Sequence, residues 1–136
     1  MSVIMVRQYS VFLPNTPGAL SAFIKLFIDQ GINIMGIASD IRDDSGVVRI
    51  AVDSDKRVGY ILTQAGFTSI ETPVLSVEMP DRPGSIFTLS KLLGDAGINI
   101  TTVYGTSLGG NRSRILVATS NPQKALEVLI ASAEMR

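Results

Sequence analysis

Apolar and polar positions follow two different periods along the first third of the chain. Between Gln8 and Leu13 they alternate, and the stretch is rich in β-forming residues, which predicts a strand. The next stretch predicts a helix that is capped by Thr16, begins at Pro17 and ends at Gly31. Its apolar residues recur at the spacing of one helix face: Leu20, Phe23, Ile24, Phe27 and Ile28.

The following residues complete a unit of four strands and two helices. Ile32–Ile41 predicts a second strand, residues 42–46 a polar turn, and Val47–Val52 a third strand. A second helix is expected over Ser54–Gly66, with Ser54 or Asp53 as its cap, and Phe67–Thr72 predicts a fourth strand. The order βαββαβ is typical of a ferredoxin-like sandwich, in which helices cover one face of an antiparallel sheet.

The chain then repeats itself. The segment NTPGALSAFIKLFIDQGINI (Asn15–Ile34) matches DRPGSIFTLSKLLGDAGINI (Asp81–Ile100) without a gap. The second copy predicts strands and helices in the same order: Val74–Met79, a helix over Gly84–Ala96, Ile98–Ser107, a turn at Leu108–Asn111, Arg112–Thr119 and a helix over Pro122–Ala133. This copy has no fourth strand, because the sequence ends with its second helix.

The missing strand is expected at the amino terminus. The offset that maps Asp81 onto Asn15 also maps Thr68–Thr72 onto Ser2–Val6. We therefore interpret residues 2–6 as a strand of the second domain, with the ribbons Ser2–Leu13 and Thr68–Met79 side by side, which would protect otherwise unpaired strand edges. A disordered amino-terminal tail is the alternative. The predicted fold class is α+β, with ferredoxin-like domains over residues 1–72 and 73–136.

Composition limits the chemistry. The 136 residues are 46% hydrophobic, and 12 basic residues balance 12 acidic ones, so no general attraction to nucleic acid or to an anionic membrane is expected. With no histidine and no cysteine, the commonest general base, thiolate metal sites and disulfides are excluded. We expect a cytoplasmic protein that is not an enzyme and that folds without metal or cofactor.

The repeated motif resembles the ACT domain family. The motif is a strand, then N-x-P-G-[AS]-[LI], an amphipathic helix and G-I-N-I entering a strand. It occurs in both copies, with Asp81 in place of the asparagine in the second, so nearly the whole chain is similar to a tandem ACT pair. The resemblance implies a regulatory module that binds an amino acid or a similar small ligand. Two functions stay open: a free-standing sensor, or the regulatory subunit of a separate biosynthetic enzyme, as in the small subunit of acetolactate synthase.

The residue chemistry agrees with a zwitterionic ligand. The start of a helix offers N–H donors to a carboxylate, and a glycine lets a ligand approach the backbone. In the first copy these candidates are Asn15, Gly18, Ala19 and Leu20. In the second copy they are Asp81, Gly84, Ser85 and Ile86, and the exchange of Asn15 for Asp81 predicts two non-equivalent sites.

The start of the second strand supplies the remaining candidates. The resemblance implies that Asn33 and Asn99, next to Ile34 and Ile100, contact the ligand, often from a neighbouring domain. Ordinary turn chemistry after a helix-ending glycine is the alternative. Strand residues are expected to form a mainly apolar pocket wall: Met35, Ile37, Thr101 and Val103.

The predicted sheet leaves two long apolar strands at its outer edges, Asn33–Ile41 and Asn99–Ser107. Such edges are rarely left bare in soluble proteins. We therefore expect a homodimer joined through these strands, which would bring the asparagine corner of one chain towards the Pro-Gly loop of the other. The alternative is a monomer whose own loops cover the edges.

Overall fold

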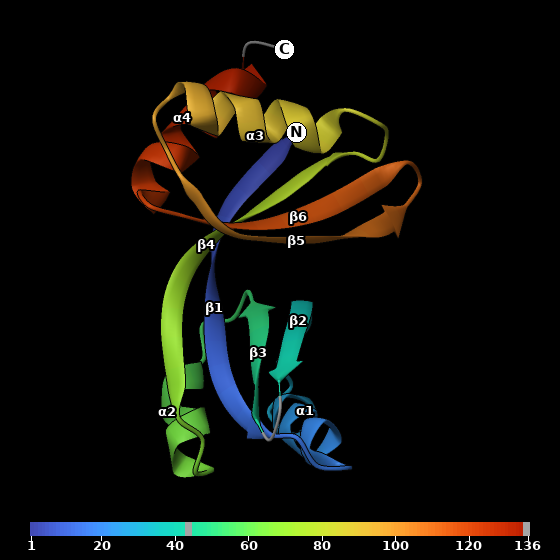
Figure 1. Ribbon diagram of the computed structural model, residues 1–136, viewed down its shortest axis with the longest axis vertical. Helices are drawn as coiled ribbons and strands as arrows, with labels where there is room; N and C mark the ends of the chain where they lie inside the picture. The colour runs from blue at the N-terminus through green and yellow to red at the C-terminus, as the bar shows by residue number, and fades with distance from the viewer. Residues whose placement is uncertain (43–44, 135–136) are drawn as a thin grey trace. The chain divides into compact units, whose positions relative to one another are not determined.

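The computed structural model describes residues 1–42 and 45–134 (Figure 1). The chain forms these strands and helices in order: β1 (Ser2–Pro14), α1 (Ala19–Asp29), β2 (Ile34–Arg42), β3 (Ser45–Val52), α2 (Val58–Gln64), β4 (Ser69–Pro80), α3 (Ser85–Asp95), β5 (Ile100–Gly109), β6 (Arg112–Thr119) and α4 (Pro122–Glu134). The strands are hydrogen-bonded in the order β2-β3-β1-β4-β6-β5.

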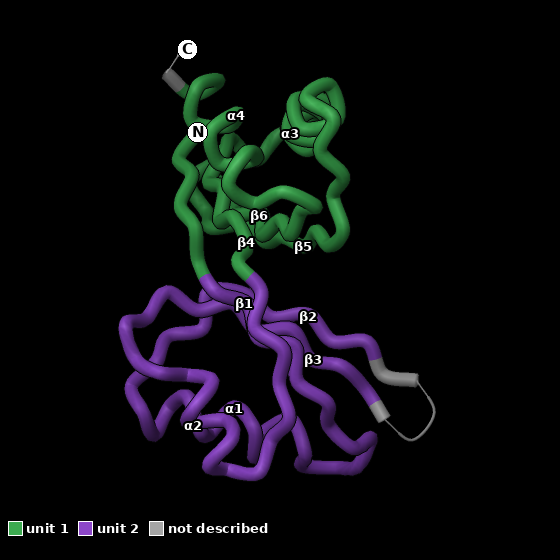
Figure 2. Tube along the Cα trace, turned by 90° about the vertical axis from the view of Figure 1, so that its left-hand side faces the viewer, with its two compact units in different colours: residues 1–6, 73–136 green, residues 7–72 purple. Residues whose placement is uncertain are grey.

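The elements divide into two compact units (Figure 2). Unit 2 is formed by Arg7–Thr72 and holds the first copy of the repeat, whereas unit 1 combines Met1–Val6 with Pro73–Arg136 and holds the second copy. Since β1 and β4 contribute to both units, each unit has four strands. Their order is β2-β3-β1-β4 in unit 2 and β5-β6-β4-β1 in unit 1. The predicted pair of ferredoxin-like domains is confirmed.

Residues 2–6 supply the fourth strand of unit 1. Val6 is buried with 4% of its surface exposed, and Met1, Val3 and Met5 pack against the apolar core of this unit. The alternate residues Ile4 and Ser2 are exposed or half-exposed, as expected where successive side chains point to opposite faces of a sheet. The interpretation of this segment as a disordered tail is therefore wrong.

Each unit has its own core between one face of its sheet and its two helices. In unit 2, alternate residues of β1 and β3 meet Phe23 and Phe27 of α1 and Val58 and Leu62 of α2. In unit 1, β4 and β6 meet Leu89 and Leu93 of α3, together with α4. The period of two in the strands is confirmed, but the predicted face of the first helix is only partly buried: Phe23, Ile24 and Phe27 pack in the core, whereas Leu20 and Ile28 are 42% and 71% exposed.

Two helix starts differ from the prediction. Thr16 does not cap α1, and Pro17 lies before the helix, because the cap position belongs to Gly18 in a left-handed conformation with no side-chain cap. The helix predicted from Ser54 begins later, with Arg57 at its cap position. Ser54 instead accepts a hydrogen bond from the Lys56 N–H at 3.1 Å, in the turn that precedes the helix. Residues 43 and 44 of the predicted polar turn lie outside the described residues.

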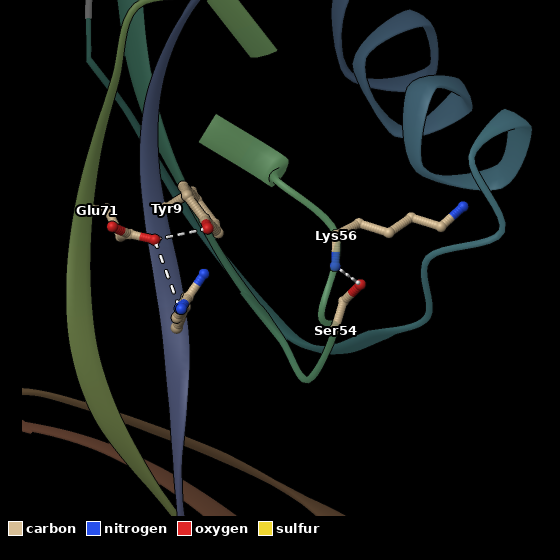
Figure 3. A network of polar contacts seen from close by, with 5 residues as sticks. Tyr9, Ser54, Lys56 and Glu71 are labelled. Atoms are coloured by element: carbon tan, nitrogen blue, oxygen red, sulfur yellow. Dashed lines mark hydrogen bonds and ion pairs between the residues drawn. The ribbon is translucent and has the colours of Figure 1, made fainter. Parts of the chain in front are cut away.

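A polar cluster joins β1 to β4 in unit 2 (Figure 3). The buried Tyr9 donates a 2.8 Å hydrogen bond from its hydroxyl to Oε1 of Glu71, and Arg7 Nε lies 3.7 Å from the same oxygen. The Arg7–Glu71 ion pair is exposed and contributes little. Burial, and then the Glu71 carboxylate, raise the pKa of the Tyr9 phenol above its ordinary value.

The raised pKa of Tyr9 predicts a loss of stability in alkali. The phenol is favoured neutral in the folded state, so its contribution is complete below pH 10.0, the ordinary pKa, and disappears as the pH rises through the higher folded-state pKa. Tyr9→Phe should flatten this alkaline decline and cost about 1 kcal/mol at neutral pH. Urea unfolding at several pH values tests this. An unchanged alkaline decline in Tyr9→Phe would show that other groups cause it.

The two faces of the amino-terminal strand predict opposite mutational effects. Met5→Ser removes an apolar side chain that packs against the core of unit 1 and should cost about 1–2 kcal/mol. Ile4→Ser, at a side chain that is 44% exposed, should change stability by less than about 0.5 kcal/mol. Deletion of residues 1–6 should accelerate amide exchange in β4. Equal effects of the two serine variants would contradict the assigned strand faces.

Candidate functional site

The repeated Pro-Gly pairs form two matching β-turns. Ala19 N–H donates to Thr16 O at 3.2 Å, and Gly18 has φ 86° and ψ −10°. In the second copy Ser85 N–H donates to Arg82 O at 3.3 Å, and Gly84 has φ 94° and ψ −15°. These are the features of a type II turn, which favours proline at its second position and requires a residue tolerant of positive φ at its third.

The turns change the set of available donors. Ala19 and Ser85 were predicted to offer their N–H groups to a ligand, but the turn hydrogen bonds already use both groups. Leu20 and Ile86 follow in the first helical turn, where N–H groups have no acceptor within the helix. Both side chains are exposed, by 42% and 54%, and lie beside the turns.

Each turn borders a pocket between the start of its helix and the hairpin of its unit. In unit 2 the pocket has a volume of about 60 Å³, and its lining includes Leu13, Asn15, Ala19, Leu20, Ser39 and Val48. In unit 1 the corresponding pocket has a volume of about 270 Å³, and its lining includes Asp81, Arg82, Ser85, Ile86, Gly105 and Ile115. We call these the first and the second loop pocket. Six of the twelve predicted site residues therefore line the two loop pockets: Asn15, Ala19, Leu20, Asp81, Ser85 and Ile86.

The second loop pocket has a larger volume than the first, and its lining includes charged side chains. Asp81 replaces Asn15 and Arg82 replaces Thr16, so the lining gains an aspartate and an arginine that are adjacent in sequence. Gly105 replaces Ser39 on the strand wall, which removes a side chain from the lining. A Cβ atom at Gly105 would lie 2.5 Å from Ile115 Cδ1 and 2.9 Å from Arg114 O, so the isoleucine occupies the space that a side chain would need.

The asparagines lie at the opposite end of each sheet from the turns. In unit 2, Ile34 pairs with Val52, which pairs with Arg7, whereas the Pro-Gly turn follows Pro14. Seven residues of strand separate these ends, or about 23 Å. Asn33 and Asn99 are exposed, and Ile34 and Ile100 pack against the cores. No single unit therefore combines an asparagine with its own turn.

The pocket walls were predicted too close to the start of each second strand. Ser39, Gly105 and Thr106 line the loop pockets, rather than Met35, Ile37, Thr101 and Val103. The hairpin explains the difference, because the far end of β2 or β5 pairs with the part of β3 or β6 that lies beside the loop. Counting strand register back from the turn at Leu108–Asn111 would have identified Gly105 and Thr106.

Residues 1–42 and 45–134 offer neither a cluster of metal-ligating side chains nor a helix able to cross a membrane. In this part of the chain no three histidine, cysteine, aspartate or glutamate side chains gather in a group that could hold a metal ion. No helix among the same residues has the length and apolar character needed to cross a membrane.

The fold is shared with solved proteins. A protein from Bacteroides thetaiotaomicron superposes with a TM-score of 0.85 at 24% identity, with 96% of this chain and 90% of that chain covered. The ligand-free regulatory subunit of aspartate kinase from Thermus thermophilus gives a TM-score of 0.71 at 16% identity, with 96% of each chain covered. The corresponding subunit from Thermus flavus gives 0.61 at 14% identity, covering 99% of this chain and 96% of that one.

A search of curated protein sequences finds no match. The family model for the ACT domain pair matches residues 4–134. This range includes both Pro-Gly turns and most of the amino-terminal strand. The repeated motif, the two four-stranded units and this match agree, and the chain belongs to the ACT domain pair family.

Proposed function

We propose that this protein is a non-catalytic regulatory module that binds an amino acid in the second loop pocket. The observation that carries the proposal is the composition of that pocket, whose lining includes both Asp81 and Arg82. A zwitterion needs a partner for its ammonium and a partner for its carboxylate, and these side chains supply one of each. The pocket of about 270 Å³ is close to the lower end of the size range of small-ligand sites.

The first loop pocket supports a different role. At about 60 Å³ it holds little more than one or two water molecules, and its rim carries Asn15 and Thr16 in place of the charged pair. We infer that the first copy serves mainly as scaffold and that binding is concentrated in the second copy. Asn15, Gly18, Ala19 and Leu20 then maintain the turn rather than contact a ligand.

A second chain would complete the site. β2 and β5 lie at the two ends of the strand order, and Ile37 and Val103 on them are 43% and 50% exposed. If β5 pairs with its own copy in antiparallel fashion about a two-fold axis, the Asn99 end of one strand meets the Ser107 end of the other. That end adjoins Gly105 and Thr106, so Asn99 of one protomer would reach the second loop pocket of its partner.

A regulatory subunit of a separate enzyme is the second candidate. The Thermus thermophilus aspartate kinase subunit matches this chain over 96% of both lengths, so the likeness covers a whole chain that regulates a kinase. The same ligand site would serve either function. Co-purification with a stoichiometric catalytic partner would favour this candidate, whereas a homo-oligomer that responds to an amino acid alone would favour the sensor.

Ligand binding predicts a selective effect of Asp81. In a thermal-shift screen of the twenty amino acids, a ligand at 100 times its dissociation constant should stabilise the protein by about 2.7 kcal/mol. Asp81→Ala should weaken its binding by about 10-fold or more, because a charge-assisted hydrogen bond is lost. Asn15→Ala, the matched change in the first copy, should alter affinity by less than about threefold. Absence of stabilisation by every amino acid would refute the proposal, and equal losses in both variants would refute its placement.

Edge pairing predicts a charge-sensitive dimer. Val103→Lys places a charge on the exposed edge of β5 and should raise the dimer dissociation constant by about 10-fold or more in sedimentation at several concentrations. Ile130→Lys, at a side chain of α4 that is 40% exposed, is the control and should leave the dimer intact. A monomer throughout the wild-type series would exclude the proposed second wall of the site, as would a dimer that tolerates Val103→Lys.

A further inference from the structure

A larger pocket lies on another side of the same turn in unit 1. Its volume is about 410 Å³, and we call it the Met1 pocket. Side chains from the residue before β1, from β4, the turn and α3 form its lining, which includes Met1, Met79, Arg82, Thr88, Leu89 and Leu92. It shares Pro80, Arg82 and Ser85 with the second loop pocket, but β5 and β6 contribute nothing to the lining that defines it.

The repeat explains why this pocket exists in unit 1. The offset that maps Asp81 onto Asn15 maps Leu89 onto Phe23 and Met1 onto Phe67. In unit 2 these two phenylalanines pack edge to face with ring centroids 5.3 Å apart, and Phe23 is fully buried. In unit 1 the residues at both positions lack a ring, and both line the Met1 pocket. The second copy has thus exchanged an aromatic pair for an open volume.

The lining has a defined chemical character. Met1, Met79, Leu89 and Leu92 present apolar surface, and methionine adapts its shape to different partners. At the other end Arg82 offers guanidinium donors suited to a carboxylate. Ser85 and Thr88 already donate their hydroxyl protons, to Pro80 O at 2.7 Å and to Gly84 O at 3.0 Å, so towards a ligand their oxygens act as acceptors.

We propose that the Met1 pocket is a separate binding site for an apolar amino acid. The aliphatic side chain lies among Met1, Met79 and Leu89, the carboxylate pairs with Arg82, and the ammonium donates to the hydroxyl oxygens of Ser85 and Thr88. The volume of about 410 Å³ lies within the range of small-ligand sites. Both pockets would use Arg82 for the carboxylate, and the Met1 pocket is distinguished from the second loop pocket by its apolar wall, which is built from Met1, Met79 and Leu89.

The five methionines allow a direct test with the full chain. The protein is labelled with methyl-¹³C methionine, retention of Met1 is verified by intact mass, and L-leucine is titrated while methyl resonances are recorded. The resonances of Met1 and Met79 should shift saturably, whereas Met35 on β2 in unit 2 should not. Isopentylamine, which has the same apolar group and no carboxylate, should bind at least about 10-fold more weakly.

Variants separate this site from the second loop pocket. Leu89→Phe restores the residue of the first copy and should abolish the shifts at Met1 and Met79, whereas Phe23→Leu, the reverse change in unit 2, should leave them intact. Asp81→Ala, which lines only the second loop pocket, should leave them intact as well. Leu92→Phe serves in place of Leu89→Phe if circular dichroism shows that the latter does not fold.

Three results would overturn the proposal. These are the absence of saturable shifts with L-leucine, shifts at Met35 equal to those at Met1, and shifts that persist when the pocket is filled by phenylalanine. Shifts lost in Asp81→Ala but kept in Leu89→Phe would assign leucine to the second loop pocket and also reject the Met1 pocket. In Asp81→Ala, the amino acid identified in the thermal-shift screen could lose its binding while L-leucine still causes the methyl shifts. That result would support two separate sites.

Discussion

Every strand in the middle of a sheet must satisfy backbone hydrogen bonds on both sides, and this requirement determines how the two copies are built. Each copy supplies three strands of its own, a single strand followed by a two-stranded hairpin. The sheet of each unit needs a fourth strand. β1 and β4, of 13 and 12 residues, are long enough to serve both sheets in turn. Unit 1 therefore draws its fourth strand from Met1–Val6, which is far in sequence from the rest of that unit.

The pattern of conserved positions between the copies follows from backbone conformation. Proline and glycine recur because a type II turn favours proline at its second position and needs a residue tolerant of positive φ at its third, and the turn angles of Gly18 and Gly84 agree within 8° in φ and 5° in ψ. Side chains between the turn and the helix end are constrained only by the apolar pattern. Substitutions such as Phe23 to Leu89 preserve that pattern and still change the volume beside the helix.

Most of the fold could be predicted from the sequence, and the reason is the repeat. One alignment of the copies with each other identified the elements and assigned Ser2–Val6 to the second sheet. The helix start was less predictable, because proline is favoured both at the first residue of a helix and at the second position of a type II turn. Ser54 was ambiguous for a similar reason: the same side chain caps a helix or closes a short turn.

The candidate sites were harder to predict, because a pocket depends on which side chains meet rather than on which elements form. Asp81 and the turn glycines are visible in sequence, yet Gly105 and Thr106 enter the lining through hairpin register. The Met1 pocket requires the tertiary position of a residue that is distant in sequence from α3. An alignment of the two copies nevertheless shows that the second copy has no counterpart of the Phe23–Phe67 pair. Where one copy of a duplicated domain carries smaller core residues than the other on the same backbone, close packing requires that its core collapse or leave a volume that a ligand can fill.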